Sequence, residues 1–210
     1  MLSGLIIGYD PGGNGAHGVA ELLVEEGRAT SVSTRTMATT EDVIVFLEKT
    51  PSLAALGVDT LTCWSTGKSA WRPADRWLRQ RYPAVRNSIV TPNSLFGAMG
   101  LNGMATLLAV RLKRPDTLIT ETHPKVLYYH LSGEKYDYAH DKIAMDAALA
   151  AALGVTVTPA TEHEWDAALS AFAALEGVEQ RWPNDLHRLA TETGERLVSP
   201  CGITHYFWPE

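Results

Sequence analysis

The stretch that decides the fold is Leu5-Ile6-Ile7-Gly8-Tyr9-Asp10-Pro11-Gly12-Gly13-Asn14-Gly15. Its first five residues form a short, nearly continuous apolar run, which predicts a buried strand. The proline and glycines that follow are strong turn formers, so the strand should end at Asp10. A carboxylate at the end of a buried first strand is the first candidate for a functional residue.

Two further strands are predicted directly after this turn. They cover residues 18–24 and 29–37, and Glu25-Glu26-Gly27 forms a short turn between them. Short turns join antiparallel neighbours. The first three strands should therefore form an antiparallel meander.

Helices dominate the rest of the chain. A helix should start at the N-cap signature Thr39-Thr40-Glu41-Asp42. The remaining pattern predicts strands at 53–58 and 117–120, helices at 73–81, 93–112, 124–131, 141–153 and 162–176, and loops at 60–71 and 133–140, with strand-like pieces in 197–208. This order lacks the strict alternation of a doubly wound sheet and instead favours a mixed sheet with an antiparallel edge. Without a repeat or a linker, residues 1–210 are expected to form a single α/β domain.

Composition limits the classes of function. The 210 residues are 45% hydrophobic and carry a formal net charge of −6. This charge argues against tight non-specific binding to a phosphate backbone, although a local basic patch and metal ions remain compatible with it. The first residues lack a basic signal-peptide region, and the longest apolar stretch, residues 143–155, is too short to span a bilayer. With two isolated cysteines, Cys63 and Cys201, we expect a protein of the reducing cytoplasm with no membrane partner.

Acidic residues follow three predicted strands: Asp10, Asp59 and Glu121. Ligands gather beyond the carboxyl ends of parallel strands, so these side chains should meet there. Three carboxylates held together would repel one another without a cation, and Mg²⁺ prefers such oxygen ligands. Each acid alone could simply cap a helix or turn, but the three together favour a functional site.

The predicted helix 162–176 carries a fourth acid, Asp166, at the edge of its apolar stripe. Small neighbouring residues would let this part of the helix approach the sheet closely. His163 lies one turn earlier on the same side. It could be a metal ligand, a proton shuttle or a capping side chain, and for a single histidine capping is the default interpretation.

The densest basic region runs from Lys68 to Arg81 with tryptophans interleaved. Basic and aromatic side chains together can hold phosphates and stack bases, so Lys68, Arg72 and Arg76 are candidate substrate contacts. A solvated helix face explains the pattern equally well. A third interpretation is that Arg72 or Arg76 pairs with Glu121.

Two segments resemble a known superfamily. Gly8-Tyr9-Asp10-Pro11-Gly12, followed by Gly18, resembles the opening strand and turn of RNase H-like nucleases, especially the Holliday-junction resolvases. His163-x-x-Asp166-Ala167-Ala168-Leu169 resembles the closing helix of the resolvases, in which Asp or His precedes a catalytic Asp by three positions.

The wider pattern resembles an uncharacterised bacterial family of predicted RNase H-like nucleases. The acid after the fourth strand corresponds to Asp59, and the closing acid to Asp166. The Glu-x-x-Pro segment corresponds to Glu121 and Pro124. The basic stretch corresponds to Arg72, Asp75, Arg76 and Arg79. Arg79 stands one place earlier than in the family pattern. The resemblance extends over roughly residues 5–176.

The resemblance implies an RNase H-like fold, with a mixed five-stranded sheet flanked by helices, and two-metal hydrolysis of a phosphodiester by Mg²⁺ or Mn²⁺ ions about 4 Å apart. Asp10 would bridge both ions, and Asp59 and Asp166 would bind one each. Glu121 joins the catalytic set, although the resolvases place their second acid differently.

The implied partner is nucleic acid, held transiently by Lys68, Arg72, Arg76 and His163, and a homodimer is left open. The alternatives are a nucleotide-binding relative of sugar kinases and actin-like ATPases, and a non-catalytic domain that retains the fold.

Overall fold

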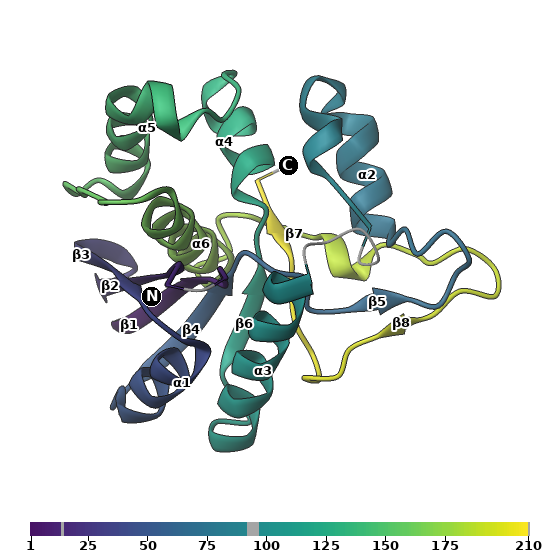
Figure 1. Ribbon diagram of the computed structural model, residues 1–210, viewed down its shortest axis with the longest axis horizontal. Helices are drawn as coiled ribbons and strands as arrows, with labels where there is room; N and C mark the ends of the chain where they lie inside the picture. The colour runs from purple at the N-terminus through teal and green to yellow at the C-terminus, as the bar shows by residue number, and fades with distance from the viewer. Residues whose placement is uncertain (14, 92–96, 210) are drawn as a thin grey trace.

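A mixed five-stranded sheet forms the centre of the computed structural model, which describes residues 1–13, 15–91 and 97–209 (Figure 1). The strand order is β3-β2-β1-β4-β6. The strands are β1 (Gly4–Asp10), β2 (His17–Glu25), β3 (Arg28–Met37), β4 (Leu53–Val58) and β6 (Leu118–Glu121).

The pairing confirms the predicted antiparallel meander and the mixed sheet. Strand β2 runs antiparallel to both β1 and β3, whereas β1 and β4, and β4 and β6, are parallel. Tyr9 is paired with Val58, and Val58 with Glu121. The carboxyl ends of β1, β4 and β6 therefore meet at one edge of the sheet.

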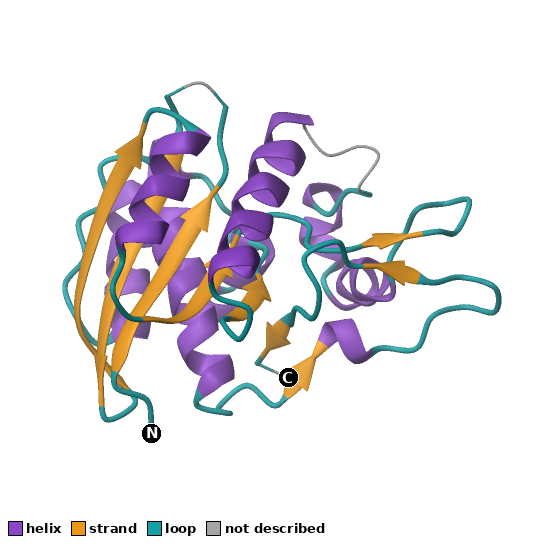
Figure 2. Ribbon diagram, turned by 90° about the horizontal axis from the view of Figure 1, so that it is seen from below, coloured by secondary structure: helices purple, strands orange, loops and turns teal. Residues whose placement is uncertain are grey.

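Helices cover both faces of the sheet (Figures 1 and 2). On one face α1 (Thr40–Lys49) packs beside α3 (Gly97–Lys113), over a core that includes Ile7, Leu56 and Leu107. On the other face α6 (Glu162–Val178) contacts every strand of the sheet. Helices α4 (Pro124–Ser132) and α5 (Tyr138–Leu153) pack outside α6.

Helix α2 has the predicted ends, 73–81, and the helices predicted after it are found with shifted ends. The helix expected at 93–112 is described from Gly97, and its predicted start at 93–96 lies outside the described residues. Helix α5 begins within the segment expected to be a loop and departs from helical geometry at Asp141, where the prediction placed its start. In the described part of the chain, no helix is long and apolar enough to cross a membrane.

The C-terminal segment closes the end of the molecule beside β6. An isolated parallel bridge joins Thr120 to His205. Two small sheets are formed by β5 (Trp64–Ser65) with β8 (Leu197–Val198), and by β7 (Asn184–Asp185) with β9 (Phe207–Trp208). Helix α2 (Pro73–Arg81) and the short 3₁₀ helices η1 (Pro83–Ser88) and η3 (Leu186–Arg188) complete this region.

Three glycines allow α6 to lie unusually close to the sheet. A Cβ atom on Gly8 would lie 1.8 Å from the carbonyl oxygen of Ala167, and one on Gly18 would lie 1.9 Å from that of His163. Gly57 on β4 meets the Ser170 carbonyl oxygen in the same way. Neighbouring strands therefore present backbone, without side chains, to the helix backbone.

We expect Gly8→Ala to destabilise the protein by about 3 kcal/mol, because its new methyl group would force the α6 backbone away from β1. The matched control is Gly13→Ala, since a Cβ atom there meets nothing within 4 Å among the described residues. The control should change stability by no more than about 0.5 kcal/mol. Urea unfolding of the three proteins measures both effects. Equal stabilities would show that α6 can move away from β1 and accommodate the methyl group without a loss of stability.

Candidate active site

Three acidic side chains gather at the edge where the parallel strands end. Asp10 is the last residue of β1 and is 1% exposed, and Asp166, on α6, is 5% exposed. Asp59 directly follows β4, and its amide donates a hydrogen bond of 2.9 Å to the Tyr9 carbonyl. That bond fixes Asp59 next to the end of β1, while the close approach of α6 brings Asp166 to the same edge.

These carboxylates are not fully satisfied within the described chain. Asp10 and Asp166 each have a buried Oδ1 atom without a hydrogen-bond partner there, and the Tyr136 hydroxyl, also without a partner, lies near Asp166 and lowers its pKa. Burial raises the pKa of Asp10, Asp59 and Asp166, and the negative charge of Asp10 raises the pKa of the other two further. A buried acid with a spare oxygen is costly unless a proton or a cation joins it.

His163 is in direct contact with Asp10. Its Nδ1 lies 2.5 Å from Asp10 Oδ2, and this hydrogen bond raises the pKa of His163. The interpretation of His163 as a capping residue is wrong, because the Thr161 hydroxyl caps α6 by accepting a hydrogen bond from the Glu164 amide. His163 is therefore placed to orient Asp10 and to hold a proton beside it.

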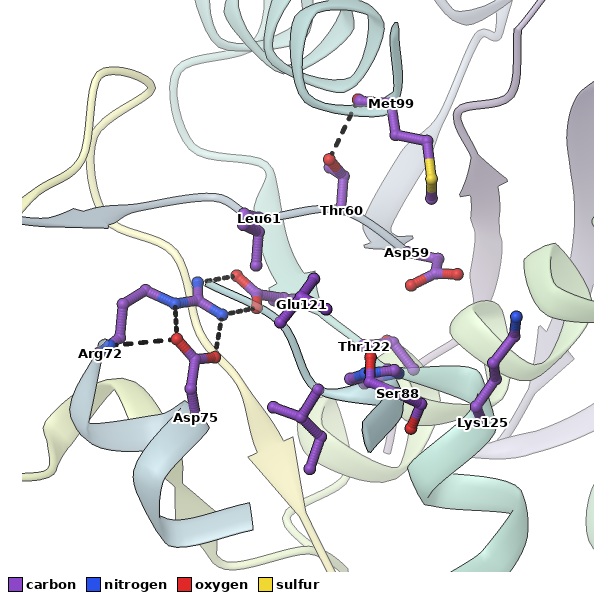
Figure 3. A pocket seen from close by; sticks show the side chains of 13 residues that line it. Asp59, Thr60, Leu61, Arg72, Asp75, Ser88, Met99, Glu121, Thr122 and Lys125 are labelled. Atoms are coloured by element: carbon purple, nitrogen blue, oxygen red, sulfur yellow. Dashed lines mark hydrogen bonds and ion pairs between the residues drawn. The ribbon is translucent and has the colours of Figure 1, made fainter. Parts of the chain in front are cut away.

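Lys125 was missed in the sequence and lies among the same groups. It is exposed at the start of α4, and its positive charge lowers the pKa of Asp10, Asp59 and Asp166. Figure 3 shows its side chain and the Asp59 carboxylate facing the same space. The available signal was its position directly after Glu121-x-x-Pro124, where a strand end leads into a helix.

Glu121 occupies a different environment from the three aspartates. Its Oε2 accepts hydrogen bonds from the Thr62 amide at 2.9 Å and from Arg72 at 2.8 Å, and its Oε1 accepts from Arg72 at 2.6 Å. Burial alone would raise the pKa of Glu121, but Arg72 and His187 outweigh it and lower that pKa. Both oxygens are engaged by protein donors, which is typical of a structural carboxylate, and the catalytic role expected for Glu121 stays a prediction.

Arg72 forms ion pairs inside the protein. It is 1% exposed and donates to Asp75 at 2.7 Å as well as to Glu121 (Figure 3). This is the ion-pair alternative that the sequence left open. Arg72 is buried and already pairs with two carboxylates, so the structure favours the ion-pair interpretation, and its role as a substrate contact stays a prediction.

The rest of the basic region is largely engaged in internal contacts. Arg76 donates to Glu195 at 3.0 Å, and Arg79 lies over the Trp71 ring, 4.7 Å from its centroid. Lys68 is exposed on the loop before α2. The phosphate-binding face predicted for this region is therefore smaller than expected, and its exposed part includes Lys68.

Some features of the site fit a divalent cation. Asp10 and Asp166 provide unpaired carboxylate oxygens, the ligand type that Mg²⁺ prefers. A cation would also offset the mutual repulsion of the aspartates. Within residues 1–13, 15–91 and 97–209, however, no three His, Cys, Asp or Glu side chains form a ready-made metal cluster.

Solved structures with a similar fold include RuvC of Thermus thermophilus. RuvC of Thermus thermophilus in complex with a Holliday junction substrate aligns with a TM-score of 0.50 at 16% identity, covering 83% of this chain and 95% of that chain. A second Thermus thermophilus RuvC structure aligns with a TM-score of 0.48, also at 16% identity, covering 84% and 96%. The alignment with a TM-score of 0.50 and the mixed five-stranded sheet flanked by helices give the chain the RNase H-like fold. No protein-family model and no curated protein matches the sequence.

We expect Arg72→Ala to destabilise the protein by about 3–5 kcal/mol, because it leaves two buried carboxylates without their cation. Arg76→Ala, on the helix that Arg72 precedes, is the matched control; its more exposed ion pair should contribute about 1 kcal/mol. Since folding lowers the pKa of Glu121, the wild-type advantage is present at neutral pH and is lost on acidification below the ordinary pKa of 4.5. Denaturant unfolding at several pH values checks this, and similar losses in both variants would contradict it.

Proposed function

We propose that the protein is a metal-dependent nuclease that hydrolyses phosphodiester bonds of nucleic acid. The observation that carries the proposal is the pair of buried aspartates, Asp10 and Asp166, each with an unpaired oxygen at the edge of an RNase H-like sheet. Asp59 adds a third carboxylate next to Asp10. Buried like charges with raised pKa values are typical of functional sites.

In this proposal Asp10, Asp59 and Asp166 hold Mg²⁺ or Mn²⁺. A bound pair of these ions would supply activation of the attacking water and stabilisation of the leaving oxygen. His163 orients Asp10 through its hydrogen bond and holds a proton at Nδ1. Lys125 attracts the substrate phosphate and offsets part of the negative charge of the site.

The proposed partner is nucleic acid bound transiently. The Thermus thermophilus RuvC of the comparison is in complex with Holliday junction DNA, and a similar fold supports a related class of substrate here. The net charge of −6 requires a local source of attraction. We assign that role to Lys125, with Lys68 and Arg76 as outer contacts.

We expect Mg²⁺ or Mn²⁺ to support cleavage of a panel of single-stranded, double-stranded and branched DNA and RNA. Asp10→Asn should abolish cleavage, because the variant loses a charged carboxylate of the proposed metal site. Asp116→Asn, in an exposed turn, is the control and should cleave like the wild type. Cleavage that persists in EDTA, or full activity in Asp10→Asn, would exclude this mechanism.

Asp166 should destabilise the protein when no metal is bound. Because folding raises its pKa, wild-type stability should fall relative to Asp166→Asn as the pH rises above the ordinary value of 3.8. In EDTA at neutral pH, Asp166→Asn should therefore melt at or above the wild-type temperature.

Metal should reverse this order. An ion at ten times its Kd stabilises the folded state by about 1.4 kcal/mol, which corresponds to roughly 3–6 °C for a chain of this length. Wild type should gain this increase in Mg²⁺ or Mn²⁺, and Asp166→Asn should not. Calorimetric melts with and without metal measure both effects; an equal response in the two proteins would rule out a metal site at Asp166.

A further inference from the structure

A cavity of about 160 Å³ opens directly beside Asp59 (Figure 3). Its walls come from the segment after β4, the start of α2 with Arg72 and Asp75, the end of η1 with the residues that follow, the start of α3 and the junction between β6 and α4. Asp59 and Lys125 line it, so it is continuous with the candidate active site. Whatever occupies the cavity is thus adjacent to the proposed reaction centre.

The lining of the cavity combines apolar walls with polar groups. Leu61, Ile89, Val90 and Met99 provide the apolar surface. Apolar walls with a few placed polar groups are the usual composition of a small-molecule site. An inorganic anion would not use these walls.

Two polar residues of the lining have unmet hydrogen-bonding capacity. Thr122 is 3% exposed, and its Oγ1 has no hydrogen-bond partner in the described part of the protein; the same holds for the buried Nδ1 of His123. His123 Nε2 lies 3.1 Å from the Ser88 carbonyl oxygen, which can only accept, so Nε2 carries the proton. In the neutral ring Nδ1 is then an acceptor.

These groups define the chemistry of the ligand. Thr122 can donate or accept a hydrogen bond and His123 can accept one, so a ligand with polar atoms on its edge would satisfy them. The apolar walls favour flat faces on the same ligand. A heterocyclic base has both properties, whereas an aliphatic ligand would leave the buried polar atoms unpaired at a cost in free energy.

We propose that this cavity binds one unstacked nucleobase of the nucleic-acid strand whose phosphate lies at Asp10, Asp59 and Asp166. The inference rests on the proposed function for the position of the phosphate. Proteins that take a base out of its stack read it by hydrogen bonds to its edge and by contact with apolar side chains. The cavity would then make the protein sensitive to base identity next to the bond that it cleaves.

The test is calorimetric titration with the 5′-monophosphates of adenosine, guanosine, cytidine, uridine and thymidine in Mg²⁺. Ribose 5-phosphate, which lacks the base, is the control ligand. We expect saturable binding of at least one nucleotide, at least about tenfold tighter than ribose 5-phosphate. Thr122→Val should weaken that nucleotide by about 2- to 10-fold, the effect of one hydrogen bond.

Two features make the test decisive. Thr122→Val removes a hydroxyl without a partner in the described chain, so it should melt at or above the wild-type temperature and report on binding alone. Val90→Trp should abolish nucleotide binding by filling the cavity. Nucleotides that bind no tighter than ribose 5-phosphate, or an unchanged Kd in Thr122→Val, would overturn the inference.

The outcome is separable from that of the nuclease proposal. Asp166 does not line the cavity, so Asp166→Asn should lose cleavage and weaken nucleotides and ribose 5-phosphate alike, keeping the preference for the nucleotide. Base-dependent binding without cleavage of any nucleic acid would reject the nuclease and keep the base site. Cleavage without base-dependent binding would reject the base site and keep the nuclease proposal.

Discussion

The contact on which the rest of the structure depends is the backbone-to-backbone approach of α6 to the sheet. Gly8, Gly18 and Gly57 lie on three adjacent strands, and the carbonyl groups of α6 occupy the space where their side chains would be. An ordinary layer of side chains would hold the helix farther away. The same approach carries His163 and Asp166 to the end of β1, so the packing of the core and the geometry of the site have one origin.

The buried acidic side chains occupy two contrasting environments. Glu121 is neutralised by Arg72 and receives hydrogen bonds on both oxygens, which makes it part of the framework. Asp10 and Asp166 remain incompletely paired at the same edge of the sheet. Stability alone would favour satisfying all of them. The difference between these environments separates a structural carboxylate from candidates for chemistry.

The sequence was sufficient for the fold because its signals are local. The apolar run before Asp10, the turn after it and the cap at Thr39 each act within a few residues, and the meander and mixed sheet follow from them. The partner of Glu121 was not readable in this way. Arg72 lies 49 positions earlier, and its pattern of charge suits a phosphate contact equally well. Lys125 and the cavity beside Asp59 likewise depend on which distant segments meet, and the roles of Asp10, Asp59 and Asp166 remain predictions.

The hydrogen bond between Asp10 and His163 joins residues 153 positions apart. Asp10, at the end of β1, is synthesised well before α6. Contacts of such sequence separation form late in folding, because the intervening chain must first lose its conformational freedom. Strand β1 can pair with the neighbouring β2 as soon as both have been synthesised, but the Asp10 carboxylate still lacks its partner on α6. The site comes into being only when α6 emerges and docks, so incomplete chains lack the arrangement altogether.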